Sequence, residues 1–401
     1  MANRDIPQME QLVEGSSLKN RDVDLLGSFK YTTKLTGLDC TACASATNNA
    51  VSRTFSFLSR AIAILVIILM FYRAFSFLGT DGKLLTFYWS EGNTFGFIGL
   101  YTVVCSFCVM GWTANAFIPN YLKNLNQVRL LRLEQDDQID DYRGLRKKIS
   151  ICPLPLLFAL FFSQVYNAVH GKILYTGETV PAYKYSVFPI LAFISWMASS
   201  TCLIYYILVQ FSMYREIEYF NKELQKTIEG RKLKDLSTIA DFSFRQRELL
   251  KLVNKANESL QSYAKVAPLF CFFSLINAIY NMYFITTVPA PYAAVLAFLL
   301  ISSIEITVLT LLPAARVQEQ VAITAKLLME SDEIENADDP KVYQIYRTMV
   351  DRSLKCETRI FVINAFGINS TNFNVAMFAI PNLGTFLIML RKLLESNGIN
   401  F

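Results

Sequence analysis

The sequence predicts an all-helical membrane protein that crosses the bilayer seven times, with a cytosolic N-terminus, an extracellular C-terminus and helical extensions in the cytosol. Three observations predict this fold class. Hydrophobic residues make up 53% of the chain and charged residues 18%, long apolar runs recur seven times, and basic residues gather on one side of those runs. The mean hydropathy of +0.32 also indicates a bilayer as the solvent.

The seven apolar runs have the length that a membrane helix needs, about 20 residues for about 30 Å of hydrocarbon. A polar stretch that includes Arg4, Asp5 and Arg21 precedes the first run, so we expect this run to remain as a helix and not to be cleaved as a signal peptide. A soluble protein would need more amphipathic helix around so many apolar ones. The runs lie at 57–78, 94–118, 151–169, 187–211, 266–288, 291–312 and 360–390.

Basic residues predict the orientation, because short cytosolic loops carry the excess of Lys and Arg. Of the 38 Lys and Arg, all but six fall in the N-terminal segment, in the loops after the second, fourth and sixth runs, or at the helix ends that border them. The six on the other side are Arg73, Lys83, Lys172, Lys184, Arg391 and Lys392. This asymmetry predicts the cytosolic N-terminus.

The cysteines agree with this orientation, because extracellular cysteines usually form disulfides. Three lie in predicted cytosolic segments and five within helices or at their cytosolic ends: Cys40, Cys43 and Cys356, then Cys105, Cys108, Cys152, Cys202 and Cys271. A rhodopsin-like receptor would normally carry an external disulfide and Asn-Pro-x-x-Tyr in helix seven, whereas this chain has Pro381-Asn382. That class is therefore disfavoured.

The runs divide the chain into membrane and cytosolic parts, and the external loops are too short to form a capture domain, so a ligand must enter the helical bundle. The predicted parts are a cytosolic segment at 1–56, helices one to four at 57–213, a cytosolic extension at 214–265, helices five and six at 266–312, a second extension at 313–358, and a split helix seven with a short external tail at 359–401.

Apolar stripes at helical spacing run along both extensions. Arg215 to Glu229 is predicted as helix closed by Gly230. The stripes comprise Leu249, Val253, Ala256, Leu260 and Tyr263, then Val317, Val321, Thr324 and Leu328, then Val342, Ile345 and Met349. They pack either against one another and a neighbouring subunit, or on the membrane surface.

Motifs for enzyme, metal or nucleic-acid chemistry are missing from the sequence. The pair Cys40 and Cys43 has no further ligand nearby, and the single histidine, His170, is predicted outside, so we interpret both thiols as reduced and structural. No phosphate-binding glycine loop or nucleophile elbow occurs. The net charge of +5 fits loops beside anionic lipid. We therefore expect no catalytic activity, no cofactor and no nucleic-acid partner.

The seventh run is about half as long again as a span requires, and amides and hydroxyls crowd its first part. We expect a break near Gly367 to Thr371. In the upper piece, polar residues share an arc of roughly 80° at about 100° per residue. The arc holds Asn374, Phe378, Asn382, Thr385, Met389 and Lys392. Such a stripe lines either water or a helix interface.

The segment from Thr385 to Leu393 resembles the C-terminal signature of insect gustatory receptors, which is Thr-Tyr, five apolar residues and Gln-Phe. Their superfamily includes odorant receptors and nematode gustatory-like and serpentine receptor class R proteins, and the nematode members fit best. In this chain Phe386 replaces Tyr, Arg391 interrupts the apolar run, and Lys392 and Leu393 replace Gln-Phe. The inverted seven-helix topology and the split last helix extend the resemblance over the whole chain.

This resemblance implies a tetrameric, ligand-gated channel of the plasma membrane, with four seventh helices around the pore and the cytosolic extensions as a central anchor. The stripe Asn374, Phe378, Asn382, Thr385 and Met389 would line the pore, and Lys392 with Leu393 would form the external gate. Four lysines around a pore would favour anions, although the family implies cation conduction. Alternatively, Arg391 and Lys392 extend into lipid headgroups.

A ligand pocket in the outer half of helices two to six would combine aromatic surface with a few amides. The candidates are Gln164, Asn167, Trp196, Asn277, Tyr280, Asn281 and Phe284. Asn277 and Asn281 are the strongest, because each amide must find a partner inside the membrane. Any single aromatic residue is more often a packing residue.

Glu305 is the acidic residue that lies well inside a span, flanked by Ser302, Ser303 and Thr307. An intramembrane carboxylate is a functional hypothesis by default, so it is a candidate for coupling or gating. The alternative is a structural tie to a base such as Arg60.

The leading hypothesis is a chemosensory receptor that is itself a ligand-gated channel, with a small-molecule ligand, membrane lipid and a homo- or hetero-tetramer as partners. The alternatives are a seven-helix receptor that signals through an intracellular partner of the G-protein type, and a scaffold that kept the fold without conduction.

Overall fold

The computed structural model describes residues 25–40, 50–75, 87–132, 142–170, 182–284, 290–331 and 339–355, and within these ranges every regular element is a helix. The elements are η1 (Gly27–Tyr31), α2 (Thr32–Leu35), α4 (Ala50–Phe75), α5 (Phe87–Ala114), α6 (Phe117–Leu130), α7 (Arg143–Ile149), α8 (Leu154–His170), α9 (Ala182–Glu229), α10 (Leu236–Phe284), α11 (Ala290–Met329) and α12 (Pro340–Lys355). The seventh predicted run, 360–390, lies outside the described residues.

Within the described residues, six helical stretches are long and apolar enough to cross a membrane. They are Arg53–Tyr72, Thr94–Ala114, Arg143–Val165, Pro189–Glu229, Leu236–Asn281 and Tyr292–Met329. Each contains most of one of the first six predicted runs. The all-helical, multi-pass membrane fold predicted from the sequence is thereby confirmed.

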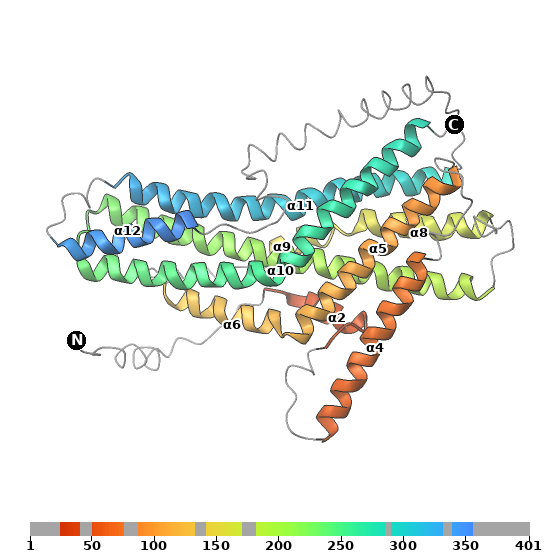
Figure 1. The fold of residues 1–401 in the computed structure, drawn as a ribbon, viewed down its shortest axis with the longest axis horizontal. Coiled ribbons are helices and arrows are strands. Elements are labelled where there is room, and N and C mark those ends of the chain that lie inside the picture. Colours follow the sequence, from red (N-terminus) through yellow and green to blue (C-terminus); the bar gives the residue numbers. More distant parts are fainter. Residues whose placement is uncertain are drawn as a thin grey trace.

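Helices α9, α10 and α11 run lengthwise through the whole molecule (Figure 1). They hold 48, 49 and 40 residues, so at 1.5 Å per residue they are about twice as long as a bilayer core is thick. Their apolar portions pack with α4, α5 and α8 in what we call the apolar half. Their remaining portions pack with α6 and α12 in what we call the charged half.

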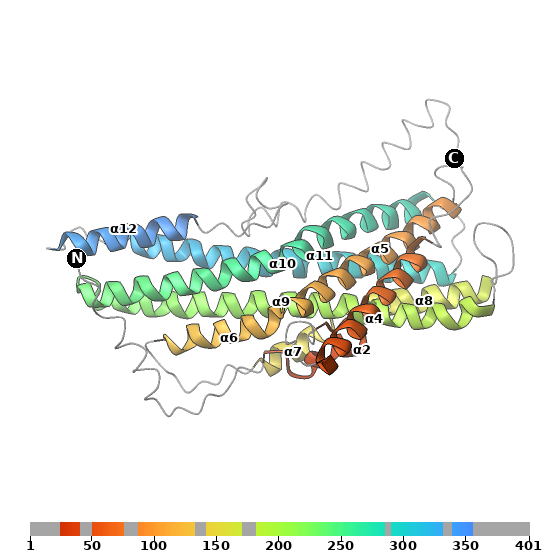
Figure 2. The same ribbon diagram turned by 60° about the horizontal axis from the view of Figure 1, so that its bottom comes forward.

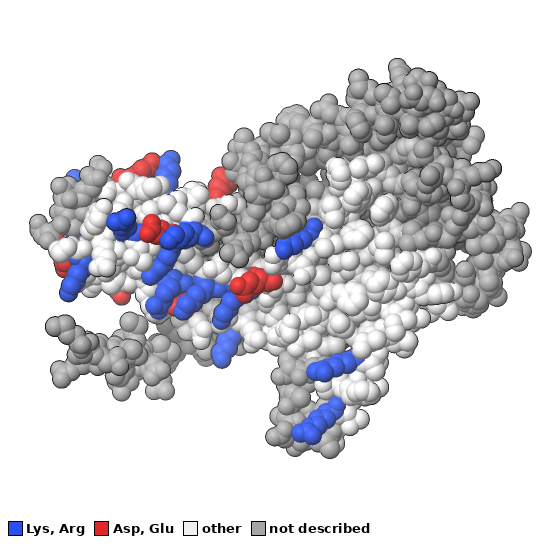
Figure 3. Space-filling view, viewed as in Figure 1, with Lys and Arg blue, Asp and Glu red and all other residues white. Residues whose placement is uncertain are grey.

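The surface of the molecule follows the same division. In Figure 3 the Lys, Arg, Asp and Glu side chains gather over the charged half, and on the described surface of the apolar half they are few and include basic side chains on the protruding end of α4. Helix α4 exposes Phe55, Phe57, Leu58, Leu65 and Ile68, each at 53% or more. So much exposed apolar area on one helix is typical of a lipid-facing surface.

Helix α9 forms the centre of the bundle. Every side chain from Met197 to Gln210 is buried, so α9 is covered on all sides in this stretch. Its hydroxyls return to the backbone of the helix: Ser199 donates to the Ser195 carbonyl at 2.9 Å and Thr201 to the Met197 carbonyl at 2.8 Å. These bonds satisfy polar groups that have no access to water.

The apolar stripes of the extensions pack against one another, which resolves the alternatives left by the sequence. Leu249, Val253, Ala256, Leu260 and Tyr263 on α10 are at most 3% exposed and belong to the main core. The stripe residues of α11 and α12 are buried as well, except that Ile345 is only partly buried. The charged half is therefore a packed helical bundle within a single chain.

The turn between α9 and α10 begins where the sequence predicted the end of the helix, at Gly230. Helix α9 ends at Glu229, and the Gly230 amide donates to the Lys226 carbonyl at 3.0 Å. The left-handed residue is Arg231, at a φ of 52°. Asp235 then caps α10 by accepting bonds from the amide and hydroxyl of Thr238, at 3.1 and 2.8 Å. Together with the Ser237 hydroxyl, these donors lower the pKa of Asp235.

Residues 25–40 form an N-terminal hook that the sequence did not predict. The hook consists of η1, α2 and their flanks; it packs on α9 and lies beside α7 (Figure 2). Leu25 and Leu38, near its two ends, are completely buried. The Thr113 hydroxyl on α5 donates to the Leu38 carbonyl at 2.9 Å, and the Tyr205 hydroxyl on α9 donates to the Phe29 carbonyl at 3.1 Å. The hook is thus part of the core.

A joint at Ala116 ends the second membrane helix and begins α6. Ala116 adopts a left-handed conformation, with φ at 47°, which is uncommon for a residue with a Cβ and costs about 1–2 kcal/mol. Beyond the joint, Tyr121 bonds the Ser212 hydroxyl at 2.6 Å. Burial raises the pKa of Tyr121 well above its usual value, so it remains a neutral phenol. The sequence-based boundary at 118 missed this change of direction by two residues.

A buried ion cluster fastens α6 to α9 in the charged half. Glu216 of α9 accepts from the Arg129 Nε at 2.9 Å and from the Arg132 Nη2 at 2.7 Å. The Arg129 Nη2 also donates to the Tyr142 hydroxyl at 3.0 Å. The Glu216 side chain is 2% exposed, so its charge depends on these two arginines.

We predict that Glu216→Ala destabilises the protein by about 3–5 kcal/mol, because two partly buried arginines would lose their counter-charge. The matched control is Glu218→Ala on the same helix, which breaks an exposed i,i+4 pair with Lys222 at 2.9 Å. That pair contributes about 0.3–0.5 kcal/mol. Thermal unfolding of the purified variants in detergent measures both effects, and equal losses would contradict the assignment.

Candidate functional site

Four buried polar side chains lie in a line along α10 in the apolar half. Cys271, Ser274, Asn277 and Asn281 follow one another at spacings of three, three and four residues, which places them on one face of the helix. They are 4%, 6%, 7% and 0% exposed. This face of α10 packs between α5 and α11.

The Asn277 amide joins the three helices through hydrogen bonds, and the Asn281 amide bonds to it within α10. The Asn277 amide nitrogen donates to the Thr94 hydroxyl of α5 at 2.5 Å, and that hydroxyl lies 3.2 Å from the hydroxyl of Tyr292 on α11. The Asn281 amide nitrogen donates to the Asn277 backbone carbonyl at 2.7 Å. All four side chains are at most 7% exposed. We call this set the amide network.

Two polar atoms on the same face lack a hydrogen-bond partner within the described part of the chain. They are the Asn281 Oδ1 and the Ser274 Oγ. Leaving a buried polar atom unpaired costs about 1–3 kcal/mol. Groups of this kind are stabilised when a ligand or a water molecule supplies the missing partner.

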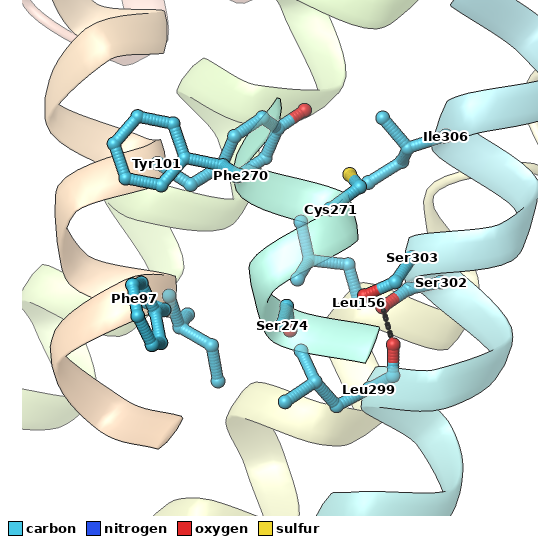
Figure 4. A pocket seen from close by; sticks show the side chains of 11 residues that line it. Phe97, Tyr101, Leu156, Phe270, Cys271, Ser274, Leu299, Ser302, Ser303 and Ile306 are labelled. Atoms are coloured by element: carbon cyan, nitrogen blue, oxygen red, sulfur yellow. Dashed lines mark hydrogen bonds between the residues drawn. The ribbon is translucent and has the colours of Figure 1, made fainter. Parts of the chain in front are cut away.

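Ser274 faces a small cavity between α5, α8, α10 and α11 (Figure 4). The space open to the centre of a water molecule is ≈ 20 Å³, enough for about one water. Aromatic and aliphatic side chains form most of the wall, and Ser274, Ser302 and Ser303 supply hydroxyls. The Ser302 hydroxyl donates to the Leu299 carbonyl at 3.0 Å, drawn as a dashed line in Figure 4.

A cluster of three tyrosines adjoins the cavity. The hydroxyl of Tyr101, which lines the cavity, lies 3.3 Å from the hydroxyl of Tyr263. Tyr263 in turn packs against Tyr206 of α9, with ring centroids 5.4 Å apart. A small apolar molecule with one or two polar atoms would match the chemistry of this wall, provided that side chains move to enlarge the cavity.

The structure brings together some of the predicted ligand residues and separates others. Asn277 and Asn281 meet in the amide network. Trp196 instead donates its indole nitrogen to the Pro153 carbonyl at the start of α8, at 2.9 Å. The Gln164 amide donates to the neighbouring Ser163 hydroxyl at 3.4 Å, and Tyr280 is half-buried. The side chains of Asn167 and Phe284 lie outside the described residues.

Three residues of the site were missing from the sequence-based candidates. Thr94, Tyr292 and Ser274 each sit in an apolar run. A Thr or Ser hydroxyl there can bond to its own helix, and a Tyr there is more often a packing residue, so none of the three gives a distinct signal. Their role follows only from the way α5, α10 and α11 meet. The signal that could have found Ser274 is its spacing of three residues before Asn277.

Glu305 lies on α11, away from the amide network. Its half-buried carboxyl group is close to the thiol of Cys152, which precedes α8. The coupling role of Glu305 stays a prediction. Within the described residues, no three His, Cys, Asp or Glu side chains form a group that could hold a metal ion.

The predicted pore and gate residues lie outside the described residues. They are Asn374, Phe378, Asn382, Thr385, Met389, Lys392 and Leu393. Their roles therefore rest on the sequence.

Comparison with known proteins identifies the family. Residues 25–384 match the family described as "Caenorhabditis protein of unknown function, DUF267". The chain belongs to this family. The match begins at the first residue of the N-terminal hook and covers all the described helices. No curated protein matches the chain.

Among solved structures, the chain is similar to the insect olfactory receptor OR5 from Machilis hrabei. The TM-score is 0.65 with 12% sequence identity, and the likeness covers 92% of this chain and 100% of that chain. At this identity the likeness shows the fold alone. This DUF267 chain therefore has the helical membrane fold of an insect olfactory receptor.

The unpaired oxygen of Asn281 yields a prediction. We expect Asn281→Leu to change the stability of the ligand-free protein by about 1 kcal/mol or less, because it removes an unsatisfied atom together with one local bond. The matched control is Asn277→Leu, which breaks the bond to Thr94 between helices and should cost about 1–3 kcal/mol. Thermal unfolding in detergent compares the two, and a larger loss for Asn281→Leu would show that this residue has a structural role.

Proposed function

We propose that this protein is a chemosensory receptor of the plasma membrane that acts as a ligand-gated ion channel. The observation that carries the proposal is the fold shared with an insect olfactory receptor over the whole length of that chain. The gustatory-receptor resemblance of the segment from Thr385 to Leu393 comes from a separate part of the sequence and supports the same class.

The ligand in this proposal is a small, mostly apolar molecule that binds beside the amide network. The Asn281 Oδ1 and the Ser274 Oγ lie on one face of α10, about two turns apart, and both lack a partner within the described part of the chain. A ligand with a hydrogen-bond donor satisfies one of them. The surrounding Phe97 and Phe270 supply apolar contact.

The pore in this proposal is formed by helix seven of four subunits, in a homo- or hetero-tetramer. Asn374, Phe378, Asn382, Thr385 and Met389 line it, and Lys392 with Leu393 forms the external gate. Helices α9, α10 and α11 run without interruption from the apolar half into the packed bundle of the charged half. A movement at the amide network can therefore reach the charged half through rigid elements.

A second candidate is a seven-helix receptor that signals through an intracellular partner without a pore of its own. The extended, charged half favours it, because it presents a large polar surface on one side of the apolar half (Figure 3). Current recording separates the two candidates.

We predict ligand-evoked currents in oocytes that express the full chain and show it at the surface by biotin labelling. A panel of small apolar alcohols, ketones and amines is applied under voltage clamp. Asn281→Leu should reduce the response at least about tenfold, because losing one hydrogen bond in a dry site costs about 1.4 kcal/mol or more. Surface protein that never conducts, with any compound of the panel, would argue against a channel.

We predict that Lys392→Gln shifts the reversal potential toward cation selectivity, because it removes four positive charges from the gate of a tetramer. The matched control is Arg391→Gln, one residue earlier, which in this proposal faces lipid headgroups and should leave the reversal potential unchanged. Recordings in solutions of unequal NaCl concentration give both values. A shift caused by Arg391→Gln and not by Lys392→Gln would reverse the assignment of the gate residue.

A further inference from the structure

A second cleft lies in the charged half, between α10 and α12. Its volume is ≈ 430 Å³, within the range of about 300–1,000 Å³ that small-molecule sites occupy. The residues that line it are Arg247, Leu250, Lys251, Asn254, Thr348, Asp351, Arg352 and Lys355. We call it the basic cleft. It shares no residue with the amide network or its cavity.

The two walls of the basic cleft present matching faces. On α10, Arg247, Lys251 and Asn254 follow the spacing i, i+4, i+7, which places them on one side of the helix. On α12, Thr348, Arg352 and Lys355 follow the same spacing. The cleft therefore has an arginine and a lysine on each wall. Figure 3 shows Lys and Arg gathered over this half of the molecule.

Positive charge exceeds negative charge in the basic cleft. Four of its residues are cations and one, Asp351, is an acid. Glu248, beside the lining, pairs with Arg247 at 3.1 Å and with Lys251 at 2.8 Å, which still leaves more cations than acids. Elsewhere in the charged half, single pairs such as Lys326 with Glu330 balance each other. Like charges on facing walls repel, and a bound anion would relieve that repulsion.

Hydrogen bonds between the helices hold the walls of the basic cleft in place. The Arg352 Nη1 donates to the carbonyl and hydroxyl oxygens of Ser243, at 3.2 and 3.0 Å. The buried Gln246 amide donates to the Met349 carbonyl at 3.0 Å and to the Ser353 hydroxyl at 2.8 Å. The cleft is therefore formed before any ligand arrives, which lowers the entropic cost of binding.

We propose that the basic cleft binds a soluble polyphosphorylated small molecule. Guanidinium and ammonium groups on two facing walls suit a ligand with several phosphate groups, because each phosphate accepts charge-assisted hydrogen bonds. A lipid headgroup has the same chemistry, but Asn254 lies twelve residues before the apolar run that starts at Val266, about 18 Å along the helix. The free compound therefore fits better than the lipid.

The test measures binding of sodium tripolyphosphate to the purified full chain in neutral detergent by isothermal titration calorimetry. We expect saturable binding that weakens as NaCl rises. Replacing both Lys251 and Lys355 with Gln should weaken it at least about tenfold, because two charge-assisted contacts are lost. The matched control replaces Lys147 and Lys148 of α7, both exposed and outside the cleft, and should change the affinity by less than about twofold.

A further variant keeps the proposal testable if removal of the lysines disturbs folding. Asp351→Asn removes the one acidic side chain of the cleft lining. It should strengthen tripolyphosphate binding about two- to fivefold, because this negative charge repels the negatively charged ligand. No gain from Asp351→Asn, no binding by the unaltered chain, or an equal loss in the α7 control would each overturn the proposal.

Nanodiscs separate the soluble ligand from a lipid headgroup. The titration is repeated in nanodiscs of phosphatidylcholine, with and without phosphatidylinositol bisphosphate. Equal affinity for tripolyphosphate in both supports the proposal, whereas competition by the anionic lipid would assign the cleft to a headgroup. The measurement involves no current, so its result is independent of the proposed receptor function.

Discussion

The fold depends on one constraint: α9 passes through the molecule with no side exposed over a stretch of four turns. In a membrane protein, no water is available to such a helix, so its polar groups depend on the protein for hydrogen-bond partners. Ser199 and Thr201 meet this requirement on their own backbone, and Tyr206 donates to the Thr310 carbonyl of α11 at 2.8 Å. The remaining helices are arranged so as to cover α9.

The same constraint explains why the amide network is unusual. Around α9 the buried hydroxyls are paired and the Gln210 Oε1 is not, whereas on one face of α10 both the Asn281 Oδ1 and the Ser274 Oγ lack a partner, within the described part of the chain. Each unpaired atom lowers the stability of the folded protein, and on this face of α10 the fold retains two of them. We take this as the physical reason to place ligand recognition at α10 and not at the more aromatic surface around Trp196.

The sequence was sufficient for the features that arise from local pattern. Hydropathy located the membrane helices, and periodicity identified the stripe from Leu249 to Tyr263 as buried. The rule that a membrane amide needs a partner singled out Asn277. Contacts between residues far apart in the sequence could not be predicted from local patterns. The partners of Asn277 are Thr94, 183 residues away, and beyond it Tyr292. The turn at Ala116 and the packing of residues 25–40 likewise depend on helices elsewhere in the chain.

The N-terminal hook has a consequence for how the protein is made. The hook leaves the ribosome before the helices that it packs against, because one of its anchors, Tyr205, comes 176 residues after its hydrogen-bond partner Phe29. Until α9 has been inserted by the translocon, the buried leucines of the hook, Leu25 and Leu38, have no complete binding surface. The hook must therefore remain undocked, with these leucines accessible to chaperones, until α9 is in place.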